Sequence, residues 1–124
     1  MKIVELADYI QAQTGIPIFP LAFPAAELAP AECGTVQFLT SYTKAKGGTQ
    51  RVNVQMIVRS DHPEKAEAMA LGLASFFDGK TDFNVGSNHI IFVDMRTPFP
   101  LFVGKDNADN YRYSVTMVLL IDKQ

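Results

Sequence analysis

Two histidines, one cysteine and one acidic turn are the residues of this 124-residue chain whose types could support catalysis or metal binding. His62 stands at the start of a predicted helix and His89 at the start of a predicted strand, where we expect both to face solvent. Cys33 follows Glu32 and has no basic or histidine neighbour in the sequence. Because a nucleophilic thiol needs a lowered pKa, the sequence favours a packing role for Cys33.

The acidic turn has the composition of a calcium loop without its spacing. The EF-hand ligand positions and the distal Glu are missing, so a polar turn is the preferred interpretation. Neither histidine has a Cys or acidic cluster at metal-ligand spacing, and the chain contains no phosphate loop, Gly-x-Gly-x-x-Gly or Gly-x-Ser-x-Gly motif. We therefore expect no catalytic, cofactor-binding or metal-binding residues. The turn residues concerned are Asp106, Asn107, Asp109 and Asn110.

Composition predicts one globular domain over residues 1–124. Hydrophobic residues make up 48% of the chain, which is enough for a packed core. The formal net charge of -2 gives no reason to expect tight nonspecific binding to nucleic acid or to anionic membranes. A single cysteine excludes an intrachain disulfide. The acidic N-terminal stretch is no secretory signal and no apolar run reaches membrane-spanning length, so we expect a soluble protein made in a reducing cytoplasm.

The best-defined predicted element is an amphipathic helix over residues 61–77. Asp61 and Glu64 have the spacing of a capping box, Pro63 is tolerated in a first turn, and Gly79 can end the helix in the left-handed conformation. Its apolar stripe consists of Ala66, Met69, Ala70, Leu73, Phe76 and Phe77.

A second helix is predicted over residues 2–14, followed by an apolar extended segment over residues 16–23. Pro17 and Pro20 cannot donate hydrogen bonds to a neighbouring strand, so this segment is an edge strand at best. The proline-bounded loop over residues 24–34 fits either an inter-subunit contact or a connection lying over the core.

The remaining elements predict a mainly antiparallel sheet. Residues 35–42 and 51–59 form a hairpin with a polar tip over residues 43–50, and residues 80–87 form a turn-rich connection. Strands follow at residues 88–97 and 111–121, with residues 101–104 extended between them. We therefore expect an α+β fold, a mainly antiparallel sheet with two helices packed on one face.

Apolar residues also occupy strand positions that should face solvent. A small domain with surplus apolar strand surface usually hides it in an oligomer, and this is the sharpest inference from the residues alone. The positions concerned are Ile57, Val118, Leu120, Phe99 and Phe102.

The second half of the chain has a distinctive order of elements: the strand ending Val58-Arg59-Ser60, the helix at 63–77, the strand at 90–95, the segment at 98–106 and the run Tyr-Arg-Tyr-Ser-Val-Thr-Met at 111–117. In this order and composition the chain resembles the small tail terminator proteins of long-tailed bacteriophages, also described as minor capsid or tail completion proteins. The resemblance extends over most of the domain, from the N-terminal helix through the terminal strand, and includes no short invariant motif.

The resemblance implies a structural protein without enzymatic activity or cofactor. Its subunits would form a hexameric ring at the head-proximal end of the virion tail after assembly in the host cytoplasm. The ring would end tail-tube polymerisation and join the tail to the head, so the implied partners are further copies of the chain, the tail tube protein and the head–tail connector proteins. DNA would pass through the lumen without specific binding. The alternatives are another head–tail adaptor or a tail tube subunit, with a small α+β enzyme third.

The subunit contacts are expected at apolar edge segments and outward strand arginines. The candidate interface residues are Ile18, Phe19, Leu21, Phe99, Phe102, Arg51, Arg59 and Arg112. The arginines could form inter-subunit ion pairs, line a lumen, or simply be solvated. The candidate partner-contact loop is the hairpin tip with Lys44, Lys46, Gly47 and Gly48, for which a solvated tip is the alternative.

Overall fold

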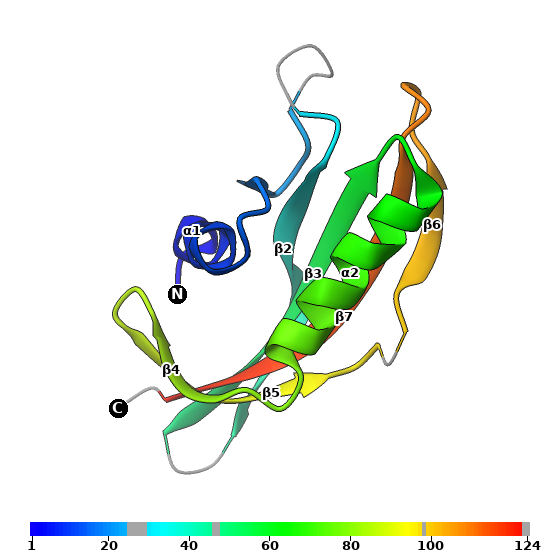
Figure 1. Cartoon of the computed structure of the whole chain (residues 1–124). Helices are drawn as coiled ribbons and strands as arrows, with labels where there is room; N and C mark the ends of the chain where they lie inside the picture. The colour runs from blue at the N-terminus through cyan, green and yellow to red at the C-terminus, as the bar shows by residue number, and fades with distance from the viewer. Residues whose placement is uncertain (25–29, 46–47, 98, 123–124) are drawn as a thin grey trace.

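Two helices lie on one face of a curved, mostly antiparallel sheet in the computed structural model (Figure 1). The structure describes residues 1–24, 30–45, 48–97 and 99–122, with backbone only for residues 40–45. This architecture confirms the predicted α+β fold. The elements in chain order are α1 (Ile3–Thr14), β1 (Ile18–Pro20), β2 (Cys33–Ala45), β3 (Thr49–Ser60), α2 (Pro63–Phe77), β4 (Thr81–Val85), β5 (Asn88–Met95), β6 (Leu101–Lys105) and β7 (Tyr111–Asp122).

The sheet is organised around β7. Its strand order is β1-β2-β3-β7-β5-β4, and β6 pairs with β7 beside β5. Consequently β5 and β6 follow one another along the same side of β7, β5 on its second half and β6 on its first. The pairing of β1 with β2 is parallel, whereas the other described pairs are antiparallel.

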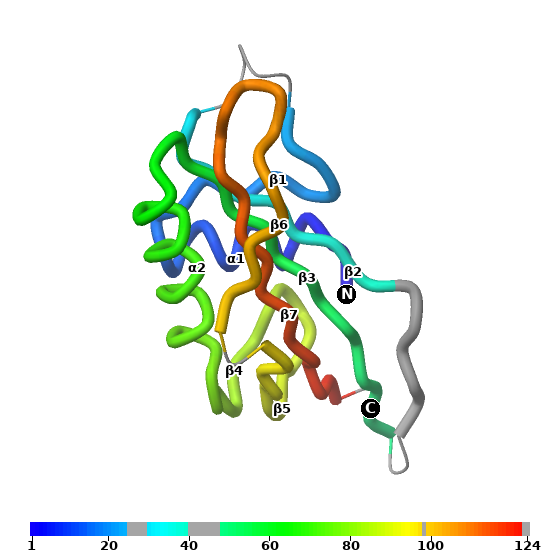
Figure 2. Tube along the Cα trace, turned by 90° about the vertical axis from the view of Figure 1, so that its right-hand side faces the viewer, coloured from blue at the N-terminus to red at the C-terminus, as the bar shows by residue number. Residues whose placement is uncertain are grey.

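The strand registers place β1 and β6 at opposite ends of the same cross-strand rows. One row runs from Phe19 through Thr35, Ile57 and Ser114 to Leu101. The adjacent row runs from Ile18 through Gly34, Val58 and Tyr113 to Phe102. Figure 2 shows both edge strands toward the same end of the sheet.

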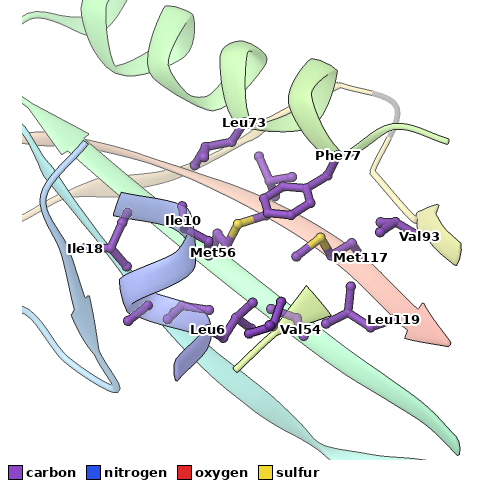
Figure 3. Close-up of a cluster of buried hydrophobic side chains, with 14 of the residues drawn as sticks. Leu6, Ile10, Ile18, Val54, Met56, Leu73, Phe77, Val93, Met117 and Leu119 are labelled. Carbon is purple, nitrogen blue, oxygen red and sulfur yellow. The ribbon is translucent and has the colours of Figure 1, made fainter. Parts of the chain in front are cut away.

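The core lies between the helices and the sheet. Alternate residues of β3 and β7 point into it, as the sequence pattern predicted, and they are almost fully buried. Each such apolar side chain contributes about 1.5–3 kcal/mol through removal from water. Figure 3 shows the side chains that meet there, which include Leu6, Ile10, Val54, Met56, Leu73, Phe77, Met117 and Leu119.

The predicted capping box at the start of α2 is wrong. The helix begins at Pro63 with His62 as its N-cap, and no side chain caps its first turn. Asp61 lies before the cap, where its carboxylate accepts a hydrogen bond from the Ser60 hydroxyl at 3.4 Å. That hydroxyl in turn accepts from the His62 backbone N–H at 3.2 Å, so Ser60 shapes the entry to the helix.

Residues 80–87 were predicted as a connection, but they contain a strand. β4 pairs antiparallel with β5, placing Phe83 opposite Ile90 and Val85 opposite Asn88. Only Phe83 and Val85 give this short segment an apolar alternation, and Val85 is fully buried. Pairing with β5 stabilises a strand that the local sequence specifies weakly.

Candidate interaction surface

The segment over residues 97–104, which includes most of β6, carries the largest concentration of exposed apolar side chains in the described part of the chain. Phe99 is 74% exposed, Leu101 60%, Phe102 54% and Val103 38%. Residues 97–104 contain no charged residue. Strand edges are normally protected by charged residues, prolines, bulges or a covering segment, because an open apolar edge invites pairing with another chain. This segment is the candidate interaction surface and is called the β6 edge below.

The β6 edge is held in place from β7. The Phe102 ring lies against Tyr113 at a centroid distance of 5.5 Å and against Tyr111 at 6.3 Å. The register shifts between Phe102 and Lys105, and Arg112 Nη2 donates to the Val103 carbonyl oxygen at 3.3 Å within this irregular stretch. These contacts fix the position of the β6 edge relative to β7.

The turn between β6 and β7 is organised by one carboxylate. Asp106 accepts hydrogen bonds from the backbone N–H groups of Ala108 and Asn110, both at 2.9 Å, and from Asn110 Nδ2 at 3.2 Å. Partial burial favours the neutral acid, but the bonds from Asn110 and Ala108 and the nearby Arg59 outweigh it and lower the pKa of Asp106. These bonds agree with the polar-turn interpretation, and the described residues contain no cluster of three potential metal ligands.

Arg59 joins three segments at the same end of the sheet. Its guanidinium lies 3.4 Å from Asp106 Oδ2, donates to the Pro30 carbonyl oxygen at 3.4 Å and stacks over the Phe23 ring at 4.6 Å. The residue is only 5% exposed. Arg59 lies on the face of β3 away from the core, as predicted, but the expectation that it is open to a partner or to solvent is wrong, because Phe23 and Pro30 cover its side chain.

Cys33 lies directly opposite Arg59 in the β2–β3 register and is fully buried. Burial raises the pKa of the Cys33 thiol, and the opposing effect of Arg59 is too small to reverse it. A protonated, buried thiol is a poor nucleophile. The structure therefore places the cysteine in a packing position, as the sequence favoured.

The opposite edge of the sheet, at β1, is closed to strand pairing. Gln11 of α1 accepts the Ile18 backbone N–H at 3.1 Å through its Oε1, and Pro20 has no N–H to offer. Ile18 points into the core and is 5% exposed. Phe19 is half-buried, whereas Leu21 follows β1 with a φ of 74° and is 64% exposed. This edge therefore offers apolar side chains but few free backbone groups.

The helix-free face of the sheet carries a polar ladder. Gln37 Nε2 donates to Gln55 Oε1 at 2.7 Å, and Gln55 Nε2 donates to the Ser114 hydroxyl at 3.1 Å. These bonds cross β2, β3 and β7 and satisfy amide groups that would otherwise cost stability where they are partly buried. The ladder thus gives the middle of this face a polar character.

Beside the ladder, a shallow pocket on the same face mixes apolar and charged side chains. Arg96 pairs with Asp94 at 3.4 Å, and Arg51 is exposed without an ion pair among the described residues. The lining residues are Arg51, Phe92, Asp94, Arg96, Val118 and Leu120. Val118 and Leu120 were both predicted to be apolar residues at solvent-facing strand positions. In the structure Val118 is buried at 7% exposure and Leu120 is half-buried.

The predicted partner-contact loop falls mostly outside the described residues. Lys46 and Gly47 lie there, and the side chain of Lys44 at the end of β2 is not described either. Gly48 is exposed and has a φ of 81°, a left-handed conformation that suits glycine immediately before β3.

The two histidines occupy unrelated surface sites. His89 lies beside Asp82 at 3.1 Å from Nε2 and beside Asn84 at 3.1 Å from Nδ1, where β4 and β5 pair. His62 is 3.8 Å from Asp61 at the start of α2. The two imidazole rings therefore take part in separate surface contacts.

Sequence reasoning missed part of the β6 edge. Phe99 and Phe102 were predicted, but Leu101 and Val103 were not. The signal was present in the uncharged run over residues 97–104, which borders charged residues at Arg96 and Lys105. Three other exposed apolar positions, Val4, Leu71 and Phe92, were also missed.

The fold and the open β6 edge describe a small α+β protein with the surface of an assembly subunit. A family model described as Bacteriophage tail terminator protein matches residues 12–123. The chain therefore belongs to the bacteriophage tail terminator family and has a structural role in phage tail assembly. Comparison with curated proteins gives no match. In the described residues, no helix has both the length and the apolar character needed to cross a membrane.

Proposed function

We propose that this protein closes into a ring, most simply a hexamer, on the head-proximal end of a phage tail tube. There it ends tube polymerisation and presents the surface to which the head–tail connector proteins bind. The proposal rests on membership of the terminator family, supported by one observation, the uncovered apolar β6 edge. Such an edge is a liability in a monomer and is buried when copies associate through heterologous contacts.

The interface residues of this proposal come from both edges of the sheet. Phe19 and Leu21 at the β1 edge and Phe99 and Phe102 at the β6 edge supply apolar contact, with Ile18 supporting the first from the core. Arg51 is the arginine best placed to pair with a neighbouring subunit, because Arg59 and Arg112 already bind acceptors within the chain. The hairpin tip with Lys44, Lys46, Gly47 and Gly48 is proposed to contact the tube or the connector.

DNA is proposed to pass through the ring without specific binding. The net charge of -2 provides no strong attraction to phosphates. Three of the four arginines also engage acceptors within the chain: Arg59 with Asp106, Arg96 with Asp94 and Arg112 with the Val103 carbonyl. Guanidinium groups engaged in this way are poorly available to bind the phosphates of DNA that moves through the ring.

Electron microscopy and native mass spectrometry of the purified protein, alone and with tail tubes, test this function. A terminator gives single closed rings, or one ring per tube end. A tail tube subunit, the alternative, gives open-ended stacks, and a head–tail adaptor binds connector proteins without capping tubes. A strict monomer at high concentration that also leaves tube ends bare would contradict the proposal.

A further inference from the structure

The two apolar edges of the sheet lie at the same level along the strands. Phe19 and Leu101 terminate one cross-strand row, and Ile18 and Phe102 terminate the next. In a second copy placed beside the first, the end residues of these rows can therefore face those of the first copy without sliding along the strand direction. The registers alone establish this relationship, because every step of each row is a direct pairing.

The two edges also match in chemical character. Residues 16–24 and residues 97–104 are the segments concerned, and neither contains a charged residue. Leu21 and Leu101 present similarly exposed apolar side chains, at 64% and 60%. Bringing the two edges together removes apolar surface from water and leaves no ionised group of either segment unpaired.

The contact that fits these edges is made by side chains. At β1 the Ile18 N–H is already taken by Gln11 and Pro20 has none, so a partner strand cannot extend the sheet there. The outward side chains of the two edges remain available. Because the two surfaces differ and lie on opposite edges of one subunit, the contact is heterologous, and every copy in a closed ring can satisfy both.

We propose, resting on the ring function above, that the Leu101 side chain on the β6 edge of one subunit packs against Phe19 and Leu21 of the next copy. Because the two edges are level, each added subunit is rotated relative to the previous one without being displaced along the strands. A heterologous contact of this kind closes into a ring, whereas a contact with displacement propagates as an open helix. The proposal therefore supplies a physical reason for the subunits to close into a ring and not to grow as an open helix.

Cysteine cross-linking tests the pairing of edges directly. In a Cys33→Ala background, the double variant Leu21→Cys with Leu101→Cys should form a ladder of covalent oligomers ending at the ring, under oxidation or with a short bismaleimide. Both positions are exposed, so the substitutions remove little packing from the fold. Each single variant should stay monomeric on a denaturing gel, and a mixture of the two single variants should stop at covalent dimers.

The outcomes separate this inference from the proposed function. Covalent dimers from Leu101→Cys alone would show a symmetric contact and overturn the inference. Rings visible by microscopy without cross-linking of the double variant would overturn it too, while leaving the terminator function intact. Absence of both rings and cross-links in the presence of tail tubes would overturn both. The double variant Gln13→Cys with Glu67→Cys, exposed on the two helices, is the matched control and should give no ladder.

Discussion

Arg59 and Asp106 join the end of β3 to the turn between β6 and β7, with 3.4 Å between Arg59 Nη1 and Asp106 Oδ2. The arginine side chain is 6% exposed and the aspartate side chain 20%. The same guanidinium contacts Phe23 and the Pro30 carbonyl, which lie in the segment between β1 and β2. One buried residue thus fixes, relative to β3, the segments next to both proposed contact edges.

Arg59→Ala should lower the free energy of unfolding by about 2–3 kcal/mol. The change removes hydrogen bonds to a charged partner and leaves a cavity under Phe23, with the full cost of a buried pair reduced because Asp106 is partly solvated. Urea unfolding followed by circular dichroism measures the loss. Arg51→Ala is the control, since Arg51 is exposed on the same strand and should change stability by less than about 0.5 kcal/mol. Equal losses in the two variants would contradict the assigned role of Arg59.

Asp106 should make the stability of the protein depend on pH in the acidic range. Because its pKa is lowered on folding, its contribution is complete above the unfolded-state value near 3.8 and is lost as pH falls through the folded value. Unfolding free energies measured from about pH 6 to about pH 2.5 should fall less steeply at the acid end for Asp106→Asn than for the unmodified protein. An unchanged acid slope in this variant would mean that other carboxylates dominate.

Leu101→Lys should abolish ring formation while leaving the monomer folded. A charge on the β6 edge would have to be desolvated in the proposed contact, and edge lysines are a common natural defence against association. Native mass spectrometry should show monomers, with an unfolding free energy within about 0.5 kcal/mol of the unmodified protein because Leu101 is exposed. Leu71→Lys, at an exposed leucine of α2, is the control and should still form rings.

Leu73→Ala should destabilise the protein by about 2–4 kcal/mol, because Leu73 is fully buried between α2 and the sheet and the truncation leaves a cavity. Leu71→Ala, two residues earlier on the same helix, should cost less than about 1 kcal/mol, because Leu71 is 42% exposed. Thermal and urea unfolding of the pair measure the difference. Similar losses would contradict the orientation of α2 on the sheet.

Gly34→Ala should weaken both the β1 edge and assembly. An added Cβ would lie 2.9 Å from Ile18 Cδ1 and 3.1 Å from the Ile57 carbonyl oxygen, so the Ile18 side chain of β1 would have to shift and the packing of β2 against β3 would tighten. Such overpacking costs about 1–3 kcal/mol. We expect a matching loss in unfolding free energy and weaker ring formation by native mass spectrometry. Gly72→Ala, on a helix where an added Cβ meets no atom within 4 Å, is the control and should be neutral or slightly stabilising.

Local periodicity determined most of the elements. The alternation of Val54, Met56 and Val58 identified β3 and its buried face, and the helical spacing of Ala70, Leu73 and Phe77 identified the core side of α2. Such patterns are readable because a strand repeats every two residues and a helix every 3.6, whatever the rest of the chain does. The predicted apolar surplus at Phe99 and Phe102 came from the same reasoning.

The tertiary structure alone decided the features that depend on distant parts of the chain. Alternation predicted an outward Arg59, but residues more than 25 positions away cover it and turn it into an internal contact. β4 exists because β5 supplies a partner for a weakly specified segment. The alignment of Phe19 with Leu101 follows from the registers of four successive strand pairings, and a sequence pattern carries no record of register between non-adjacent strands. Composition and periodicity thus determined the fold class and the surplus of apolar surface, whereas strand register decided where that surface lies.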